Sequence, residues 1–286
     1  MEPYISTGDL AQLRIGIIGL GLMGGSLALA LRGKCQLILG LDPDPATRDL
    51  ARQWGVVDDI TDQAEVLMQQ VDLLVLAAPV SAILDWLRSL PELYTGELMV
   101  VDLGSTKVQI TTAMQALPER FDALWGHPMC GKEKSSLAHA EAGLYQGAPF
   151  AFTPLPRTSR RLRRLAEDIA GAIGASPLWL DPETHDRLTA ATSHLPYLLA
   201  NALAYITPQE AKLLAGPGFR STSRLAASSL MMMTGILSTN RENVLESMRR
   251  LQEQLSVLEN CLDKQDWQAL SSYLAAGAER QAAIVD

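Results

Sequence analysis

The fold is decided by the stretch LRIGIIGLG (13–21), which is followed at once by LMGGSLALALRG (22–33) and QLILGLD (36–42). The first piece is an apolar run that ends in glycines, as is typical of a buried strand leading into a tight turn. The second piece predicts an apolar helix that begins at the turn, and the third predicts another buried strand. A strand, a glycine turn, a helix and a further strand form the first unit of a doubly wound parallel sheet.

The same alternation of strands and helices continues to about residue 180. Further elements are expected as strands over 71–79 and 97–104, helices over 49–54 and 82–90, and two weaker strands over 149–154 and 176–180. After Pro182 the sequence offers no convincing strand, and residues 183–206 and 241–286 predict helices. The change of pattern indicates a second domain of a different class.

The composition sets limits on the class of protein. The chain has 286 residues, of which 48% are hydrophobic and 20% charged, as expected of a globular protein with about two domains. We therefore predict a flexible tail over 1–12, an α/β Rossmann-like domain over 13–180 and an all-α domain over 181–286. The net charge of −8 argues against a nucleic-acid binder, so cationic groups that hold an anionic substrate must be gathered locally.

The cysteines and the N-terminal residues point to the compartment. Cys35, Cys130 and Cys261 are far apart and form no CxxC pair, which disfavours a disulfide framework and a cysteine zinc site and favours the reducing cytoplasm. The first residues do not form a signal peptide, and the glycine-rich apolar stretch 15–31 predicts a strand and a helix rather than a membrane span. We expect no metal ligand set and no membrane or nucleic-acid partner.

A heptad-like seam marks the C-terminal helices. Apolar residues are spaced alternately four and three apart at Val244, Met248, Leu251, Leu255, Leu258 and Leu262. Such a seam serves equally for packing inside one domain and for a helix–helix contact between two subunits. On the residues alone both alternatives stay open.

Gly19, Gly21 and Gly24 form a GxGxxG fingerprint in the context that gives it meaning, after an apolar strand and at the start of a helix. The first glycine allows the tight turn, the second lets the backbone approach a pyrophosphate, and the third lets helix and strand pack closely. The backbone at the helix start, at Leu22 and Met23, supplies N–H donors for the phosphates. The motif therefore predicts a nicotinamide dinucleotide site.

The end of the next strand bears on the choice of dinucleotide. Asp42 lies 23 residues after Gly19, where a carboxylate can bind both ribose hydroxyls and would repel a 2′-phosphate. This favours NAD over NADP. Arg48 lies nearby and could hold a 2′-phosphate, so NADP stays possible. Pro79 ends the strand expected over 71–79, and we place it in the cofactor site as well.

A dehydrogenase that oxidises an alcohol needs a group to accept the hydroxyl proton as hydride leaves, and histidine suits this task near neutral pH. His127 lies in GHPM (126–129), in a loop expected beyond a strand end, and Ser105 lies in LGSTK (103–107) after the strand over 97–104. Ligands of open parallel sheets bind beyond the carboxyl ends of the strands. Both motifs are therefore expected to converge on the cofactor.

Seven motifs together resemble the prephenate and arogenate dehydrogenases of tyrosine biosynthesis. They are GLGLMGGSLA (19–28), DLGSTK (102–107), GHPMCGKEKS (126–135), LYQGAPFAFTP (144–154), HDRLTAATSHLP (185–196), GFRSTSR (218–224) and NRENVLESM (240–248). They occur in the family's order. The first is shared with many dehydrogenases, whereas GHPM, SHLP and GFRSTSR together are specific.

The resemblance implies a fold and a reaction. The fold is a Rossmann-like domain followed by a helical domain through which two subunits form a homodimer. In the reaction, hydride leaves C4 of a dianionic cyclohexadienyl ring for the nicotinamide, and the ring carboxylate is lost as carbon dioxide. By the motif match, His127 takes the proton of the 4-hydroxyl, and Ser105 orients that hydroxyl and the imidazole.

The match also assigns residues around the substrate. Arg224 holds a substrate carboxylate, which a guanidinium can do in bidentate fashion. Arg220 either helps or serves as a structural partner. Ser193 and His194 line the substrate side, and Asp186 of the HD pair is an orienting residue rather than a catalyst.

Two departures from the family pattern bear on the substrate. Members that act on prephenate often carry SHLPH, and here the last position is Tyr197, which favours arogenate. The S-D-P-x-M-W run that often follows the arginine motif reads SSLMMM (228–233) here, which alters either the pocket wall or the dimer contact.

Two other functions are compatible with the glycine motif. A β-hydroxyacid dehydrogenase needs a catalytic lysine in the helical half, where Lys212 and Lys264 lie in no matching glycine-rich motif. A dinucleotide-binding sensor without catalysis has no need of Ser105, His127 and Arg224 together. We therefore expect an NAD(P)-dependent dehydrogenase that acts on arogenate or prephenate.

Overall fold

The structure, a computed structural model, describes residues 8–132 and 134–285. By its internal contacts the chain divides into two compact units, Met1–Asn240 and Arg241–Asp286. Each unit is described by itself below.

The folded part of the chain begins earlier than predicted. Gly8–Ala11 form the short helix α1, and Leu10 is buried in the same apolar cluster as Leu13. This burial holds a part of the chain that the prediction assigned to a flexible tail over 1–12. Residues 1–7 of that tail lie outside the described residues.

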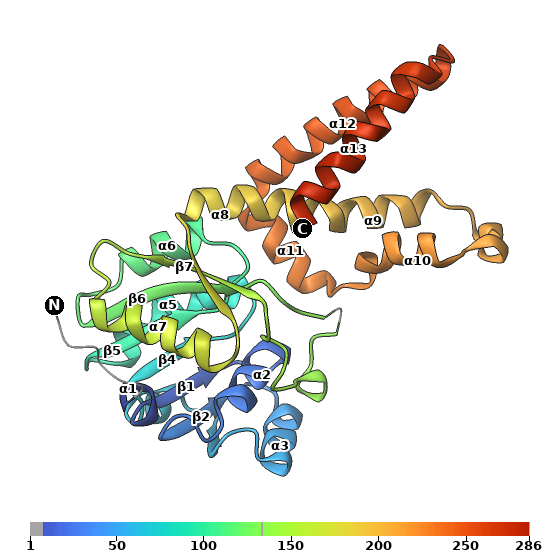
Figure 1. Cartoon of the computed structure of the whole chain (residues 1–286). Helices are drawn as coiled ribbons and strands as arrows, with labels where there is room; N and C mark the ends of the chain where they lie inside the picture. The colour runs from blue at the N-terminus through green and yellow to red at the C-terminus, as the bar shows by residue number, and fades with distance from the viewer. Residues whose placement is uncertain (1–7, 133, 286) are drawn as a thin grey trace. The chain divides into compact units, whose positions relative to one another are not determined.

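One eight-stranded sheet forms the centre of the first unit (Figure 1). Its strands are β1 (Arg14–Ile18), β2 (Leu37–Leu41), β3 (Asp59–Thr61), β4 (Leu73–Leu76), β5 (Leu98–Asp102), β6 (Phe121–Pro128), β7 (Pro149–Pro154) and β8 (Ser176–Trp179). The strand order is β3-β2-β1-β4-β5-β6-β7-β8, and neighbours are parallel except for the antiparallel pair β6 and β7. The chain order switches direction at β1, between β2 and β4, and such a point leaves a ligand-binding crevice at the carboxyl ends.

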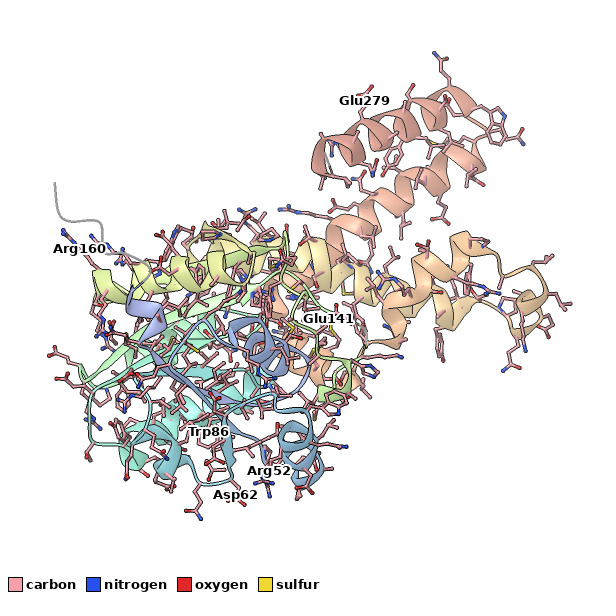
Figure 2. All side chains as sticks on the ribbon, turned by 60° about the horizontal axis from the view of Figure 1, so that its bottom comes forward. Arg52, Asp62, Trp86, Glu141, Arg160 and Glu279 are labelled. Atoms are coloured by element: carbon pink, nitrogen blue, oxygen red, sulfur yellow. The ribbon has the colours of Figure 1, made fainter. Side chains whose placement is uncertain are left out.

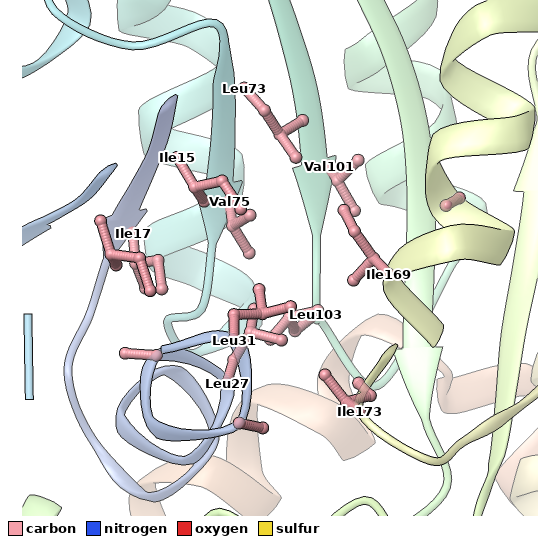
Figure 3. Packing of buried hydrophobic residues seen from close by; sticks show 14 of the residues in the cluster. Ile15, Ile17, Leu27, Leu31, Leu73, Val75, Val101, Leu103, Ile169 and Ile173 are labelled. Carbon is pink, nitrogen blue, oxygen red and sulfur yellow. The ribbon is translucent and has the colours of Figure 1, made fainter. Parts of the chain in front are cut away.

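Helices cover both faces of the sheet (Figure 1). They are α2 (Leu22–Leu31), α3 (Pro45–Trp54), α4 (Ala64–Met68), α5 (Val80–Leu93), α6 (Val108–Gln115), the 3-10 turn η1 (Leu137–His139) and α7 (Arg160–Ala172). On one face, side chains of α2 and α7 join a cluster with Leu73 and Val101 (Figure 3). On the other face, α4, α5 and α6 cover alternate strand residues such as Leu74 and Val100. Burial on both faces explains the continuous apolar runs and confirms the predicted α/β class.

Local capping explains why α3 begins earlier than the predicted 49–54. The Asp44 side chain accepts hydrogen bonds from the backbone N–H groups of Ala46 and Thr47, and Pro45 occupies the first helical position. Arg52 extends outward from the exposed face of this helix, as Arg160 does from α7 (Figure 2).

Two strands differ from the predicted set. β3 is an edge strand with the sequence DIT, too short to show an apolar run. β6 continues through His127 to Pro128 because the antiparallel strand β7 pairs with it there, with His127 opposite Ala151. His127 therefore lies at the end of a strand, and not in the loop predicted beyond one, so the sheet holds its backbone.

The chain becomes helical after β8, as predicted. The elements of this part are α8 (Pro182–Thr189), the π-helical turn η2 (Ala190–His194), α9 (Leu195–Ile206), the 3-10 turn η3 (Gln209–Leu214), α10 (Pro217–Ser223), the 3-10 turn η4 (Arg224–Ala227) and α11 (Leu230–Thr239). Tyr197, Met233 and Ile236 form a small separate core among them. A 2.7 Å hydrogen bond between the hydroxyls of Thr106 and Thr239 joins the end of α11 to the loop after β5. These helices therefore belong to the same compact unit as the sheet.

The second unit is a pair of helices, α12 (Arg241–Asp263) and α13 (Trp267–Val285). The Tyr273 hydroxyl donates to the Gln254 side chain at 3.1 Å and links the two helices. Within the predicted seam, Leu255 and Leu262 remain 50% and 54% exposed. Packing of this helix pair therefore leaves part of the seam uncovered.

Helix α2 approaches β1 closely because Gly19 and Gly24 have no side chains. Gly19 has a φ of +93°, and a Cβ there would lie 2.5 Å from the Ala77 carbonyl oxygen. A Cβ on Gly24 would lie 1.9 Å from the carbonyl oxygen of Gly19. Both obstacles are backbone atoms that cannot rotate away, so the turn requires glycine at both positions.

Gly24→Ala is expected to destabilise the protein by at least about 2 kcal/mol, because the added methyl group overlaps a backbone oxygen and the helix must shift. Gly171→Ala is the matched control, since Gly171 lies in α7 and a Cβ there meets nothing within 4 Å. That variant should be neutral or more stable by up to about 1 kcal/mol. Urea unfolding measures both values, and equal stabilities would contradict the close packing at α2.

Candidate functional site

The glycine turn after β1 and the end of β2 form one side of the candidate site. The Asp42 carboxylate accepts hydrogen bonds from the backbone N–H groups of Leu20 at 2.8 Å and Asp44 at 2.9 Å. These bonds hold the nearly buried carboxylate beside the turn. The Arg48 guanidinium donates to the Asp42 carbonyl at 2.8 Å and supports the same loop.

The start of α2 fits a dinucleotide phosphate. The first turn of the helix carries no acidic residue, and Gly19 and Gly21 have no side chains on either side of the buried Leu20. The Leu22 N–H donates to the neutral Ser135 carbonyl at 3.1 Å. The same N–H could donate to an anionic phosphate. A Cβ on Gly21 would lie 3.0 Å from the Ser135 carbonyl oxygen, which shows how close the two backbones come. With Asp42 beside it, this cradle has the parts that a dinucleotide needs.

Pro79 follows β4, the strand whose end contacts the glycine turn. It directly precedes α5, two residues after Ala77, whose carbonyl faces the Gly19 turn. Met23 lies in the first turn of α2, where its carbonyl accepts a 2.7 Å hydrogen bond from the buried Tyr145 hydroxyl. The residues predicted to bind the cofactor thus lie at the carboxyl ends of β1, β2 and β4.

A chain of three side chains leads to His127 from the helical part of the same unit. The Nδ1 atom of His127 lies 2.8 Å from Nε2 of His185, and Nδ1 of His185 lies 2.8 Å from Oδ1 of Asp186. The Asp186 carboxylate also accepts the backbone N–H groups of Lys107 at 2.7 Å and Val108 at 3.0 Å, at the start of α6. His185 and Asp186 are both 1% exposed.

The chain fixes where the protons lie. The Asp186 carboxylate accepts, so His185 carries its proton on Nδ1 and presents a lone pair at Nε2. His127 then donates from Nδ1, and its Nε2 is left without a proton. Burial lowers the pKa of His127 well below its ordinary value of 6.5, and the neighbouring His185 and Lys107 act in the same direction. His127 is therefore a neutral base with its free lone pair on Nε2.

Asn240 and His194 extend this network. The Asn240 side-chain amide donates to the backbone carbonyl of Asp186 at 2.7 Å and lies 3.2 Å from Nδ1 of His194. His194 is 1% exposed, and burial lowers its pKa to about 4. His194 is therefore neutral at physiological pH and holds Asn240 against the turn between α8 and η2.

The other predicted substrate residues lie at different depths. Ser105 follows β5 and is half-buried, and in the described part of the chain no hydrogen bond joins its side chain to His127. His185, rather than Ser105, therefore holds the His127 ring. Ser193 is exposed in η2, whereas Tyr197 is buried against Met233 and Ile236.

The two arginines lie on the surface of the single chain. Arg220 is in α10 and Arg224 begins η4, and both are exposed. The Arg220 guanidinium donates to the Ala215 carbonyl at 3.3 Å, which gives it a local structural contact.

Three residues around His127 are not identified as site residues by sequence reasoning. His185 forms a hydrogen bond with His127. The Lys107 backbone N–H donates to the Asp186 carboxylate, and the Asn240 side chain donates to the Asp186 backbone carbonyl. The HD pair at 185–186 signals an orienting role for the aspartate, but nothing in the spacing shows that the histidine faces His127.

Neither a metal centre nor a membrane span is found in the described ranges. Within residues 8–132 and 134–285, no three His, Cys, Asp or Glu side chains gather as a metal site. Over the same residues, no helix combines the length and the apolar character needed to cross a bilayer.

Comparison with known families matches both parts of the chain. Residues 27–176 match the model described as prephenate dehydrogenase, nucleotide-binding domain. Residues 181–276 match the model described as prephenate dehydrogenase, dimerization domain.

Individual relatives agree with these models. The prephenate dehydrogenase of Bacillus subtilis is 31% identical over 271 residues, which cover 90% of this chain and 72% of that protein. The crystal structure of A. aeolicus prephenate dehydrogenase with hydroxyphenyl propionate and NAD+ has a TM-score of 0.87 at 27% identity, covering 96% of this chain and 99% of that one. Synechocystis arogenate dehydrogenase has a TM-score of 0.79 at 26% identity, covering 96% and 100%.

The depressed pKa of His194 makes a prediction about acid stability. Between pH 6.5 and about 4 the unfolded chain binds a proton at this residue and the folded chain does not. The free energy of unfolding should therefore fall with decreasing pH, by at most about 1.4 kcal/mol per pH unit for one histidine. Below about pH 4 the folded form is protonated as well, and this contribution levels off.

His194→Gln should lessen this acid-induced loss, because one of the protons taken up on unfolding is removed. His139→Gln is the control, since His139 lies in η1 and is not part of the network. Denaturant unfolding of both variants and the parent at pH 7, 6, 5 and 4 gives the comparison. Parallel curves for all three proteins would show that His194 does not stay neutral in the folded chain.

Proposed function

The chain belongs to the prephenate dehydrogenase family, and we propose that it oxidatively decarboxylates arogenate in preference to prephenate, with NAD as the hydride acceptor. The observation that carries the proposal is the hydrogen-bonded chain from Asp186 through His185 to His127. This chain leaves a neutral imidazole with a free lone pair at the sheet edge that also carries the dinucleotide turn. The β-hydroxyacid dehydrogenase and the sensor receive no comparable support.

The proposed mechanism uses His127 as the proton acceptor. When bound, the nicotinamide supplies the acceptor for the hydride that leaves C4 of the substrate. As the C4–H bond breaks, Nε2 of His127 takes the proton of the 4-hydroxyl. Loss of the ring carboxylate as carbon dioxide then makes the ring aromatic, and His127 returns the proton to the phenolate oxygen. Aromatisation favours the reaction, so placement of the reacting atoms contributes more than acid–base strength.

Ser105 and the arginines complete the proposed substrate site. Ser105 orients the 4-hydroxyl from the loop after β5. Arg224, with help from Arg220, binds a substrate carboxylate, and Ser193 and His194 line the substrate side. The family resemblance supports these roles, together with the placement of all five residues in the same compact unit as His127.

The preference for arogenate rests on Tyr197. This residue is buried against Met233 and Ile236, at the position where family members that act on prephenate often carry a second histidine. A site without that histidine has one fewer group to hold the pyruvyl side chain of prephenate. The likeness to Synechocystis arogenate dehydrogenase is compatible with this choice.

The preference for NAD rests on Asp42. Its carboxylate is held beside the glycine turn by two backbone N–H groups, where it would accept from ribose hydroxyls and repel a 2′-phosphate. The A. aeolicus neighbour was solved with NAD+, which is compatible with this choice. The neighbouring Arg48 is engaged by backbone carbonyls on the same loop.

We propose a homodimer that forms through the C-terminal helices, in the cytoplasm. Residues 181–276 match a dimerization domain, and several large apolar side chains of this region are exposed in the single chain. They include Tyr205, Leu213, Leu214, Leu255 and Leu262. Of the two alternatives for the heptad-like seam, its half-exposed leucines favour the contact between subunits.

The proposed activity is tested by mixing the purified protein with arogenate or prephenate, each with NAD or NADP, and following nicotinamide reduction. Arogenate with NAD should give the highest kcat/KM. Reduction in none of the four mixtures would overturn the proposal as a whole. Faster reduction with prephenate would overturn the argument from Tyr197, and faster reduction with NADP would overturn the one from Asp42.

His127→Ala should lower kcat by at least about a hundredfold, because the proton acceptor is removed. The Kd for NAD should change by no more than about twofold, since His127 takes no part in the phosphate cradle. Steady-state kinetics and a fluorescence titration with NAD measure the two quantities. His139→Ala serves as the control and should resemble the parent, whereas equal losses of turnover and affinity in His127→Ala would make His127 a structural residue.

A further inference from the structure

Lys107 carries a buried charge that the proposed mechanism does not use. The residue is 0% exposed, and its ammonium group donates to Oδ2 of Asp102 at 2.7 Å and to the backbone carbonyl of Gly126 at 2.6 Å. The ammonium also lies 4.8 Å from the centroid of the Trp125 ring. Each of these partners lies at the carboxyl end of β5 or β6.

The contacts of Lys107 converge on the His127 network from two directions. Its side chain holds the carbonyl of Gly126, the residue directly before His127. Its backbone N–H holds the Asp186 carboxylate, which in turn holds His185. The Trp125 ring that Lys107 faces also packs edge-on against the His185 ring, with the centroids 5.4 Å apart. One residue thus contacts the supports of both histidines.

We propose that Lys107 is a positioning residue for the proton-accepting histidine: its ammonium group fixes the Gly126 carbonyl directly before His127, and its positive charge acts on the imidazole. The inference rests on the proposed role of His127. Lys107 is 0% exposed and its ammonium group is bound to Asp102 and Gly126, so it acts through His127 and takes no direct part in the reaction.

Stability alone does not account for an ion pair at this position. Taking both charges out of water is costly, and a buried pair can often be replaced by apolar residues without loss of stability. Asp102 accepts at Oδ2 from Gly104 and Lys107, and burial raises the pKa of its carboxyl and lowers the pKa of the Lys107 ammonium, so burial opposes both charges. The pair is therefore weak evidence for a role in stability, and the hydrogen bond from its ammonium group to the Gly126 carbonyl points to the neighbouring His127 instead.

Neighbouring titratable groups contribute to the lowered pKa of His127. The groups that act electrostatically on the imidazole are His185 from α8, His194 from η2 and Lys107. The carboxylates of Asp186 and Asp102 pair with His185 and Lys107, respectively. After burial and His185, Lys107 is the next cause of the lowered pKa of His127. The buried cation therefore helps to keep His127 in the form that accepts a proton.

Lys107→Met removes the charge and keeps an unbranched side chain that is one atom shorter. We expect kcat to fall by about tenfold to a hundredfold, because the reacting nitrogen is no longer held in place. The acid limb of the kcat/KM profile should move upward by about one pH unit, because the imidazole loses a neighbouring positive charge. A titration of His127 followed by NMR on protein without substrate should show the same upward shift, and it does not depend on turnover.

Two further variants separate a loss of folding from a loss of the Lys107 charge. Asp102→Asn/Lys107→Met removes both charges, so it should fold even where the single variant leaves Asp102 unpaired and unfolds. Lys34→Met is the matched control, because Lys34 is an exposed lysine that donates to the Ala172 carbonyl far from the site in sequence. Its acid limb should coincide with that of the parent.

A purely structural Lys107 would lower Tm in the single variant and leave the titration of His127 unchanged in the double variant. That result overturns the inference and leaves the proposed activity of the parent protein intact. An inactive parent, by contrast, overturns the proposed activity, and the NMR titration still decides whether the Lys107 charge acts on His127.

Discussion

The first N–H groups of α6 point out of the helix and need an acceptor, and the carboxylate of Asp186 provides it. This contact brings together residues 79 positions apart in the chain, from the edge of the sheet and from the helical part. Because the same carboxylate binds His185, the helix start also sets the direction of the hydrogen bond that reaches His127. The carboxylate that caps α6 therefore also orients, through His185, the imidazole of His127.

Burial of this network affects both the protonation of its histidines and the stability of the protein in acid. His194 and His127 are neutral because they are removed from water, and neutrality is what a base near physiological pH requires. The same burial makes protonation of the folded chain costly, so the groups that favour catalysis also favour unfolding in acid. The chemistry and the acid sensitivity therefore have one cause, and neither can be changed without affecting the other.

Features formed by neighbouring residues can be predicted from the sequence, whereas contacts between residues far apart in the chain cannot. The glycine turn, Asp42 and the alternation of strands and helices follow from contiguous residues, and the structure has them where they are expected. The hydrogen bond between His127 and His185 joins residues 58 positions apart and depends on how α8 lies at the sheet edge. Its direction is set by Asp186 and the start of α6, and no local pattern encodes such a relation. The strand pairing that extends β6 through His127 is of the same kind.

Two helix N-termini at the carboxyl edge of one sheet thus have opposite tasks. The start of α6 is capped by the Asp186 side chain of this same chain, so its N–H groups are used for architecture. The start of α2 has no side-chain cap, and Gly21, the residue directly before it, has no side chain. The Ser135 carbonyl that accepts from Leu22 is neutral, and an anionic phosphate is the stronger acceptor for the same donor. What lies against each helix start, the Asp186 carboxylate at α6 and the glycine turn at α2, therefore determines which N-terminus supports the base and which is left for a dinucleotide.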